Sequence, residues 1–411
     1  MNLTIAPAGL AGSITPPPSK SQAHRLIIAA ALAQGRSVLS NVAASQDVEA
    51  TLGCMEQLGA EHVCSGGELT VQGMEAGAMS PLRRMAFPRL DCGESGSTLR
   101  FLIPVALAVR GGGIFSGRGR LMERPQEPYF RLFHEKGISY ERKDGKLTVQ
   151  GLLAPGRYAL PGGVSSQFAT GLLFALPLLD GDSEIVLTSA LESRGYVDMT
   201  LAVLEGAGIQ VEEREDGFFV PGGQRYRPRS LAVEADWSQA AFWYAAKSMG
   251  SAVEVEGMDP GSTQGDKIVM DYLAALSGPG DVELDVSGCP DLAPPLAAAA
   301  ALRAGRTTRL SHAARLRIKE SDRLASITQA LGALGADVTE GADDLVIRGR
   351  ERLAGGAAVD SANDHRIAMM AAIAATRCEA PVTVMGAGCV AKSYPGFWDD
   401  YRALGGEIRE I

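Results

Sequence analysis

A short cationic segment near the amino end contains side chains that could bind an anion. It reads Pro16-Pro17-Pro18-Ser19-Lys20-Ser21-Gln22-Ala23-His24-Arg25. Proline fixes the backbone torsion φ and has no amide donor, so the chain enters Ser19 in an extended conformation. Ser19 suits a helix N-cap, and the apolar residues from 25 to 33 indicate a buried helix. Lys20, Ser21 and Arg25 would then lie at the positive end of that helix, where a phosphate or carboxylate is stabilised. The plainer alternative is a stiff linker with solvated cations.

A second segment rich in glycine and serine precedes another apolar run. It reads Cys92-Gly93-Glu94-Ser95-Gly96-Ser97-Thr98-Leu99-Arg100. Its small residues, Gly96 among them, would let backbone amides approach an anion closely, and Arg100 adds a cation on the first helical turn. The spacing is not that of a P-loop, because no lysine follows the second glycine.

The same pattern of polar residues before an apolar run recurs further along the chain. The segments are Glu123-Arg124-Pro125, Val164-Ser165-Ser166-Gln167, Ser193-Arg194-Gly195-Tyr196 and Ala235-Asp236-Trp237-Ser238. If these helix starts converge, their dipoles and free amides would act together on one anionic ligand. The structural alternative is ordinary helix capping, which contributes about 1 kcal/mol per cap. Capping and anion binding could both hold for the same helix starts.

Carboxylates and cations occur together in the last third of the chain. Asp291 follows Cys289-Pro290 and precedes an apolar run, so it could be an N-cap or a general base. Further on, the charged segments are Ile318-Lys319-Glu320-Ser321-Asp322-Arg323, Asn363-Asp364-His365-Arg366 and Val390-Ala391-Lys392-Ser393. A solvated, salt-bridged face would explain the first of these three. The second directly precedes the apolar run 367–375, where a solvated face is a weaker explanation.

The elements that would position these residues follow a repeating order. A helix ends at a stop glycine, and a strand, a tight turn and a second strand follow. The stop glycines are Gly59, Gly137, Gly208, Gly335 and Gly405, with a degenerate copy around Gly278. They lie about 60 to 80 residues apart, which is too long for a solenoid repeat. Six units suggest two domains of three units each, although such joints also occur by chance in α/β proteins.

Between these joints lie helices that are apolar on nearly all faces. The runs are 26–32, 101–108, 168–176, 240–246, 296–302 and 367–375. Helices of this kind are buried, so we expect helices inside each domain and sheets outside. The polar segment 224–229 and the stretch 12–18 suit crossovers between domains. We therefore expect a discontinuous domain of residues 1–14 and 228–411 and an inserted domain of residues 15–227, with the active site in the cleft between them.

The bulk composition limits the classes of function. The chain has 411 residues and a formal net charge of −9, which argues against a general nucleic-acid or anionic-membrane binder. Six cysteines include no C-x-x-C pair, so we expect reduced thiols in a cytoplasmic protein. No apolar run approaches the roughly 20 residues needed to span a bilayer, and the first residues do not resemble a secretory leader.

Taken together, the motifs resemble the 5-enolpyruvylshikimate-3-phosphate (EPSP) synthase family. The ordered set S-K-S-x-x-x-R, G-x-x-G-[ST]-x-x-R, E-R-P, S-S-Q, K-E-[ST]-D-R, N-D-H-R and A-K-[ST] runs nearly end to end and is highly specific. The resemblance implies an inside-out α/β barrel fold, with two similar domains of three βαβαββ-type units each. It also implies a monomer that needs neither metal nor organic cofactor. The family transfers the enolpyruvyl group of phosphoenolpyruvate to the 5-hydroxyl of shikimate 3-phosphate and releases phosphate. This is a step of the shikimate pathway towards chorismate and the aromatic amino acids.

The resemblance also implies a set of ligands for each substrate. For shikimate 3-phosphate they are Lys20, Ser21, Arg25, Ser165, Ser166, Gln167, Ser193, Asp291 and Lys319. For phosphoenolpyruvate they are Lys20, Gly96, Arg124, Gln167, Arg323, Arg366 and Lys392. Asp291 resembles the base that accepts the hydroxyl proton and Glu320 the acid that protonates the methylene carbon, with Lys20 a rival for either step. The cations are needed because like charges about 4 Å apart repel by roughly 4 kcal/mol at an effective dielectric constant near 20.

Four positions depart from the commonest family pattern. Glu94 and Arg315 stand where asparagine is usual, Ser97 replaces threonine and Phe101 replaces proline. These changes keep the reaction class and leave the response to glyphosate and the substrate affinities open.

Two alternatives belong to other functions. The sister enolpyruvyl transferase that acts on UDP-N-acetylglucosamine carries a reactive cysteine in the loop before its R-P dipeptide, whereas residues 119–125 of this chain contain no cysteine. A non-catalytic anion-binding protein on this fold would be expected to lack the pair Asp291 and Glu320, and both are present.

Overall fold

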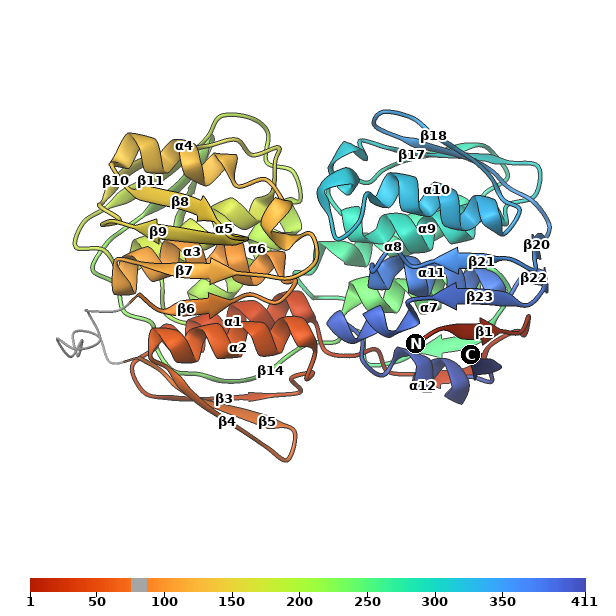
Figure 1. Ribbon diagram of the computed structural model, residues 1–411, viewed down its shortest axis with the longest axis horizontal. Coiled ribbons are helices and arrows are strands. Elements are labelled where there is room, and N and C mark those ends of the chain that lie inside the picture. The colour runs from red at the N-terminus through yellow and green to blue at the C-terminus, as the bar shows by residue number, and fades with distance from the viewer. Residues whose placement is uncertain (75–86) are drawn as a thin grey trace. The chain divides into compact units, whose positions relative to one another are not determined.

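The computed structural model describes residues 1–74 and 87–411, which divide into two compact units (Figure 1). The contiguous unit comprises residues 18–234, and the discontinuous unit comprises residues 1–17 and 235–411. The sequence places these boundaries after residues 14 and 227 instead. The later boundary differs because strand β14 (Ser230–Ala232) pairs in parallel with β3 (Arg36–Ser40) and thereby joins a sheet of the contiguous unit.

Three four-stranded sheets and six helices build the contiguous unit. Its strands are β3 (Arg36–Ser40), β4 (Glu61–Ser65), β5 (Glu68–Gln72), β6 (Arg89–Asp91), β7 (Gly112–Ser116), β8 (Ser139–Lys143), β9 (Lys146–Gln150), β10 (Gly156–Leu160), β11 (Ser183–Leu187), β12 (Glu212–Arg214), β13 (Gly217–Val220) and β14 (Ser230–Ala232). Its helices are α1 (Lys20–Leu32), α2 (Gln46–Leu58), α3 (Gly96–Arg110), α4 (Glu127–Lys136), α5 (Ser166–Ala175) and α6 (Arg194–Gly206), with 3-10 turns η2 (Leu121–Glu123) and η3 (Leu176–Leu178). The strand orders are β14-β3-β5-β4, β6-β7-β9-β8 and β10-β11-β13-β12. In each sheet the first pair is parallel and the other pairs are antiparallel, which is the predicted βαβαββ arrangement.

The discontinuous unit repeats this arrangement with one reduced copy. Its strands are β1 (Leu3–Ile5), β2 (Ala11–Ile14), β15 (Ala252–Val255), β16 (Val282–Asp285), β17 (Thr307–Ser311), β18 (Asp337–Glu340), β19 (Leu345–Arg348), β20 (Leu353–Gly355), β21 (Ala358–Asp360), β22 (Cys378–Ala380), β23 (Val382–Met385) and β24 (Ile408–Glu410). Its helices are α7 (Trp237–Ser248), α8 (Val269–Ser277), α9 (Ala293–Ala301), α10 (Arg323–Ala333), α11 (His365–Ala375) and α12 (Phe397–Ala403), with 3-10 turns η4 (Gly265–Ile268), η5 (Pro290–Leu292), η6 (Ala314–Ile318) and η7 (Ala387–Lys392).

Two of its sheets have four strands, in the orders β16-β17-β19-β18 and β21-β23-β1-β24, and the third unit of the repeat is the two-stranded pair β15-β2. The short pair β20-β22 is additional. The reduced copy is the one whose sequence cadence is degenerate around Gly278. There α8 ends at Ser277 and leads directly into β16, which already belongs to the next sheet, so no hairpin is added.

The buried helices lie where the sequence predicts them. Each of the six apolar runs falls within or overlaps α1, α3, α5, α7, α9 or α11. Every residue of α9 and α11 is buried, because these segments offer no polar face to solvent. Within the contiguous unit, Figure 1 shows α1 and α2 alongside the sheet that contains β3, β4 and β5. The prediction of helices inside and sheets outside is therefore confirmed.

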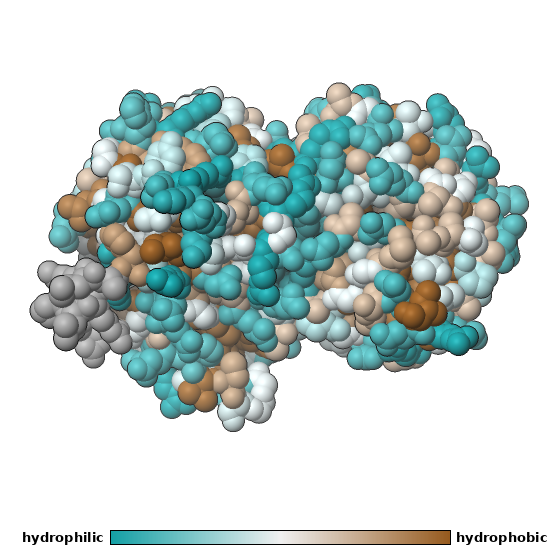
Figure 2. Space-filling model, viewed as in Figure 1, coloured by the Kyte–Doolittle hydropathy of each residue, from teal (hydrophilic) through white to brown (hydrophobic). Residues whose placement is uncertain are grey.

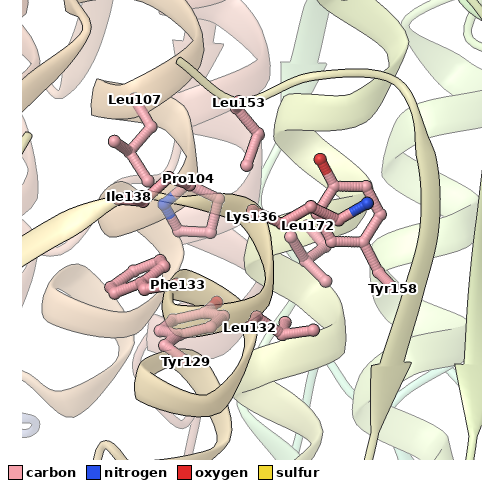
Figure 3. A pocket seen from close by; sticks show the side chains of 10 residues that line it. All are labelled: Pro104, Leu107, Tyr129, Leu132, Phe133, Lys136, Ile138, Leu153, Tyr158 and Leu172. Atoms are coloured by element: carbon pink, nitrogen blue, oxygen red, sulfur yellow. The ribbon is translucent and has the colours of Figure 1, made fainter. Parts of the chain in front are cut away.

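The surface and the core contain few apolar hollows. On the face drawn in Figure 2 the strongly hydrophobic side chains form small separate patches among hydrophilic ones. Figure 3 shows a core pocket of the contiguous unit, in which Tyr129 and Phe133 face Leu172 and the amine of Lys136 lies beside Tyr158. Its volume is about 10 Å³. That is room for one water molecule and excludes a substrate. No helix in the described ranges is long and apolar enough to cross a membrane.

Candidate active site

Carboxylates and arginines gather in the discontinuous unit where η5, α10 and α11 begin. Asp291 Oδ1 accepts a hydrogen bond from Arg323 Nη1 at 2.7 Å. Its Oδ2 accepts one from Arg366 Nη2 at 3.0 Å. Lys319 Nζ lies 3.7 Å from Asp291 Oδ1. Three predicted cations therefore surround one predicted carboxylate.

Arg323 is the centre of this cluster. Only 1% of its side chain is exposed, and it donates to Glu320 Oε2 at 2.6 Å and to Asp364 Oδ2 at 2.7 Å in addition to Asp291. Burial lowers the pKa of Arg323, but Asp364, Glu320 and Asp291 outweigh burial and raise its pKa well above the ordinary value. Arg323 is therefore a permanent cation.

The same cations fix the ionisation of Asp291. Burial alone would raise the pKa of this carboxyl. Arg366, Lys319 and Arg323 outweigh burial and hold its pKa well below the ordinary value. Asp291 is thus an anion at neutral pH, and the same contacts weaken it as a proton acceptor. It lies inside the 3-10 turn η5 and does not cap α9, so the structure does not show the N-cap alternative.

The pKa of Lys319 is also lowered, which for a lysine favours the uncharged form. Desolvation by the surrounding protein lowers the pKa of its amine to about 8, although the neighbouring Asp291 opposes this shift. Its charge therefore changes close to physiological pH.

Asp364 is a further member of this cluster, which the sequence analysis mentions without giving it a role. It is fully buried and caps α11 by accepting the amide of Arg366 at 3.0 Å. Its carboxylate also accepts from Arg323 Nε and, at 3.1 Å, from the hydroxyl of Ser321. Its position inside the N-D-H-R motif, directly before a buried helix, was the signal for this role.

Ser238 and Asp236 belong to a segment predicted as a helix start, either as an ordinary cap or as one of several starts that act together on an anion. Asp236 caps α7 by accepting from the amides of Ser238 and Gln239. The hydroxyl of Ser238 donates to Asp236 and accepts from Arg366 Nη2 at 2.9 Å. The cap of α7 therefore also orients Arg366, a contact that spans 128 residues of sequence and has no local signal.

Lys392 lies beside this cluster, at the end of η7. Its amine donates to the carbonyl oxygen of Asn363 at 2.6 Å, and 4% of the residue is exposed. All six predicted site residues of the discontinuous unit thus lie within or next to the start of α10 and α11. They are Asp291, Lys319, Glu320, Arg323, Arg366 and Lys392.

In the contiguous unit a first group of predicted residues lies at the start of α1. Ser19 caps the helix by accepting from the amide of Gln22, as predicted. Lys20 Nζ contacts Asp47 Oδ2 at 2.9 Å, a partner on α2 that sequence reasoning missed. Lys20 therefore has a carboxylate partner within its own unit.

Arg25 is buried and joins α1 to α6. Its guanidinium donates to the carbonyl of Ser21 at 2.6 Å, to Thr200 Oγ1 at 2.8 Å and to the carbonyl of Tyr196 at 2.9 Å. Its charged carbon also lies 5.1 Å from the ring centroid of Phe101. Phe101, one of the departures from the family pattern, thus supports a predicted site residue.

A second group lies where α3 and α5 begin. Gln167 Nε2 donates to Ser97 Oγ at 3.1 Å, and its Oε1 accepts from Arg100 Nη1 at 2.7 Å. A Cβ added at Gly96 would lie 2.9 Å from Arg124 Nη1 and 3.5 Å from Gln167 Oε1. Gly96 therefore makes room for the two side chains with which it was predicted to act.

The predicted serines occupy different local settings. Ser165 caps α5 by accepting from the amide of Gln167, and Ser166 begins that helix. Ser193 precedes α6 in the left-handed region, with φ 56°, and makes no side-chain cap. Such a conformation is strained for serine and often marks a functional position.

Two departures from the family pattern lie beside the predicted residues. A Cβ added at Gly119, in the loop before Arg124, would lie 2.7 Å from Glu94 Oε2. The carboxylate of Glu94 is thus directed to that loop. Arg315 donates to the carbonyl of Ser287, four residues before Asp291.

The arrangement suits the binding and proton chemistry of anions. Each unit presents cations and helix starts together, and the discontinuous unit adds two carboxylates, Asp291 and Glu320, on one arginine. Among residues 1–74 and 87–411, no group of three histidine, cysteine, aspartate or glutamate side chains is placed to hold a metal ion. The fold and the site together define a two-unit α/β protein that binds small anions and can move protons beside them.

Comparisons with known proteins identify the family. Residues 5–401 match the family model of EPSP synthase (3-phosphoshikimate 1-carboxyvinyltransferase). The chain is 44% identical to a 3-phosphoshikimate 1-carboxyvinyltransferase of Clostridium acetobutylicum over 99% of this chain and 98% of that protein. It is 43% identical to one of Clostridium perfringens over 99% of both. An EPSP synthase structure from Acinetobacter baumannii superposes with a TM-score of 0.79 at 25% identity and covers 100% of both chains. The enolpyruvyl transferase NikO of Streptomyces tendae, at 16% identity and a TM-score of 0.77, shares the fold and covers 100% of this chain and 98% of that one. The chain belongs to the EPSP synthase family.

Proposed function

We propose that the protein transfers the enolpyruvyl group of phosphoenolpyruvate to the 5-hydroxyl of shikimate 3-phosphate and releases phosphate. The observation that carries this proposal is the pair of carboxylates, Asp291 and Glu320, held on Arg323 beside Lys319 and Arg366. Enolpyruvyl transfer needs a proton acceptor, a proton donor and cations for a phosphate and a carboxylate. The cluster supplies each of these groups within one unit.

The acceptor and the donor would use different residues of the chain. Shikimate 3-phosphate would bind Lys20, Ser21, Arg25, Ser165, Ser166, Gln167 and Ser193, with Asp291 and Lys319 towards its ring. Phosphoenolpyruvate would bind Lys20, Gly96, Arg124, Gln167, Arg323, Arg366 and Lys392. Arginine suits the donor because its planar fork binds both oxygens of a carboxylate or phosphate. Residues from both units would therefore serve the same reaction.

The chemistry would proceed by addition and elimination. The 5-hydroxyl oxygen attacks the central carbon of phosphoenolpyruvate, Asp291 accepts the hydroxyl proton, and Glu320 gives a proton to the methylene carbon. The resulting tetrahedral intermediate then loses phosphate together with one methyl proton, and the double bond forms again. The two carboxyls need environments that separate their pKa values, and the cation count around Asp291 supports this. Lys20, with its partner Asp47, remains the alternative for either proton step.

Donor binding would also change the state of Asp291. Arg323 and Arg366 contact Asp291 at 2.7 and 3.0 Å. A substrate carboxylate that binds these two guanidinium groups would weaken both contacts and raise the pKa of Asp291, which would make it a stronger base.

The test is phosphate release from phosphoenolpyruvate with shikimate 3-phosphate or UDP-N-acetylglucosamine as acceptor. Release with shikimate 3-phosphate alone is expected. Phosphate release only with the nucleotide sugar would overturn the assignment of the acceptor. No phosphate release with either acceptor, in a folded sample, would favour a non-catalytic anion-binding protein. Arg348→Gln, which changes an exposed side chain on β19, is a matched control that should keep full activity.

We further propose that the enzyme works as a cytoplasmic monomer. Figure 2 shows a face that is mostly hydrophilic, and the family resemblance implies a monomer; both support this proposal. Light scattering at micromolar concentration should give one chain mass, and a dimer mass would contradict the proposal.

A further inference from the structure

The discontinuous unit contains a cavity of about 240 Å³ that the reaction does not use. Its lining includes Gly9, Gly250, Ser251, Arg352, Thr376 and Arg377. Helices α7 and α11 both end at this cavity, whereas both begin in the carboxylate–arginine cluster. An 11-residue helix spans about 16 Å at 1.5 Å per residue, so the cavity is one helix length away from the cluster.

Two arginines stand side by side in this cavity. Arg352 precedes β20 and Arg377 precedes β22, and these parallel strands pair Leu353 with Cys378. The amide of Leu353 donates to the carbonyl of Arg377 at 3.2 Å, which fixes the register at this end. Neighbouring strands lie about 4.8 Å apart, so the two arginines leave the backbone at nearly the same level.

The cavity offers this pair no side-chain counter-charge, although the carbonyl ends of α7 and α11 supply partial negative charge. No aspartate or glutamate is part of its lining. Within residues 1–74 and 87–411, neither Arg352 nor Arg377 forms an ion pair or a side-chain hydrogen bond with the protein. Two like charges held at this spacing repel, and an anion between them would remove that repulsion.

The remaining lining adds a donor and open space. The hydroxyl oxygen of Ser251 accepts a hydrogen bond from the backbone amide of Leu10 at 3.3 Å. The hydroxyl proton of Ser251 is therefore available to donate to a ligand. Gly250 has φ 102°, and a Cβ added there would lie 3.5 Å from Arg377 Nη1. A side chain at this position would therefore occupy the space in front of the guanidinium.

We propose that this cavity binds a small oxyanion, a phosphate or carboxylate group, held by Arg352, Arg377 and the hydroxyl of Ser251. Guanidinium forks match both groups. A volume of about 240 Å³ has room for phosphate or a compact acid and lies below the roughly 300–1,000 Å³ typical of sites for drug-sized ligands. The carbonyl ends of α7 and α11 repel an anion, so both arginines are needed to hold it.

The test is a titration of the ¹⁵N-labelled full chain with orthophosphate, followed by amide chemical shifts at ionic strength held constant with chloride. We expect saturable shifts at Gly9, Gly250 and Arg377, separate from any shifts at the start of α10 and α11. Malonate is the second probe. Binding of phosphate alone, or of malonate alone, identifies which oxyanion source the cavity takes. Saturation by neither at these amides overturns the proposal.

Variants decide whether the arginines hold the ion. Arg352→Gln, on an exposed side chain, should weaken the apparent affinity at least tenfold, and the double variant with Arg377→Gln should abolish the shifts. Arg350→Gln removes an exposed cation two residues away that does not line the cavity, and should leave the affinity within twofold. Equal affinity in Arg352→Gln and the native chain would contradict the proposal even if the double variant failed to fold.

Discussion

At the scale of single residues, Arg323 lies at the centre of the carboxylate–arginine cluster. It contacts three carboxylates, on Asp291, Glu320 and Asp364, and its side chain is 1% exposed. Removing one partner of a buried ion pair leaves uncompensated charge, which costs about 3–5 kcal/mol. The stability of the unit depends on this side chain, and under the proposed function the binding of the donor anion would depend on it too.

We expect Arg323→Gln to lose turnover and to lower the free energy of unfolding by about 3–5 kcal/mol, measured by urea denaturation. Arg348→Gln removes an exposed arginine paired with Asp337 and should change stability by less than about 1 kcal/mol. If Arg323→Gln unfolds with the native free energy, the three carboxylates that contact Arg323 have found other partners. Arg323 would then not be the residue that holds the cluster together.

Lys319 provides a prediction about pH. With a pKa of about 8, its amine is protonated below that pH and loses its charge as the pH rises through it. We expect kcat/KM for shikimate 3-phosphate, which reports the free enzyme, to fall on an alkaline limb near pH 8. Lys319→Arg keeps the cation and should move this limb upward by more than one pH unit. An unchanged limb in that variant would assign it to another group.

At the scale of elements, the start of α7 links helix capping to the site. Asp236 accepts the amides of Ser238 and Gln239, and Ser238 contacts Arg366. We expect Asp236→Ala to lower the free energy of unfolding by about 1–2 kcal/mol and to raise KM for phosphoenolpyruvate several-fold.

A control for this prediction lies on a helix that carries no proposed site residue. Gly137 ends α4 with φ 68°, and a Cβ there would meet no atom within 4 Å. Gly137→Ala should therefore cost about 1 kcal/mol through backbone strain alone and leave KM unchanged. If Asp236→Ala and Gly137→Ala have a similar KM for phosphoenolpyruvate, the cap of α7 does not influence the site.

Local pattern predicted the elements well because each signal lies within a few residues. The apolar run 367–375 lies inside α11, and Ser19 is the N-cap of α1. Partners of the site residues were harder to predict, since Asp47 meets Lys20 across 27 residues and Ser238 meets Arg366 across 128. The absence of a hairpin after α8 could also be predicted from a local signal, because the repeated helix–glycine–strand pattern is already degenerate around Gly278.

At the scale of the whole molecule, each unit has its own core. The two hydrophobic clusters fall within residues 18–234 and within residues 1–17 with 235–411. We expect residues 18–234 expressed alone to fold with a cooperative thermal transition, followed by circular dichroism. The fragment lacks Asp291 and Glu320, so it should release no phosphate from phosphoenolpyruvate. Turnover by this fragment would contradict the requirement for residues of both units.

The most direct test of the account is the fate of the methylene protons in D₂O. If Glu320 protonates the methylene carbon, that carbon becomes a methyl group and then loses one hydrogen. Product formed from ordinary phosphoenolpyruvate and shikimate 3-phosphate should then carry deuterium in its vinyl group, read by ¹H NMR. Glu320→Gln should lose both turnover and this exchange. Product with a fully protonated vinyl group would contradict addition and elimination through a tetrahedral intermediate.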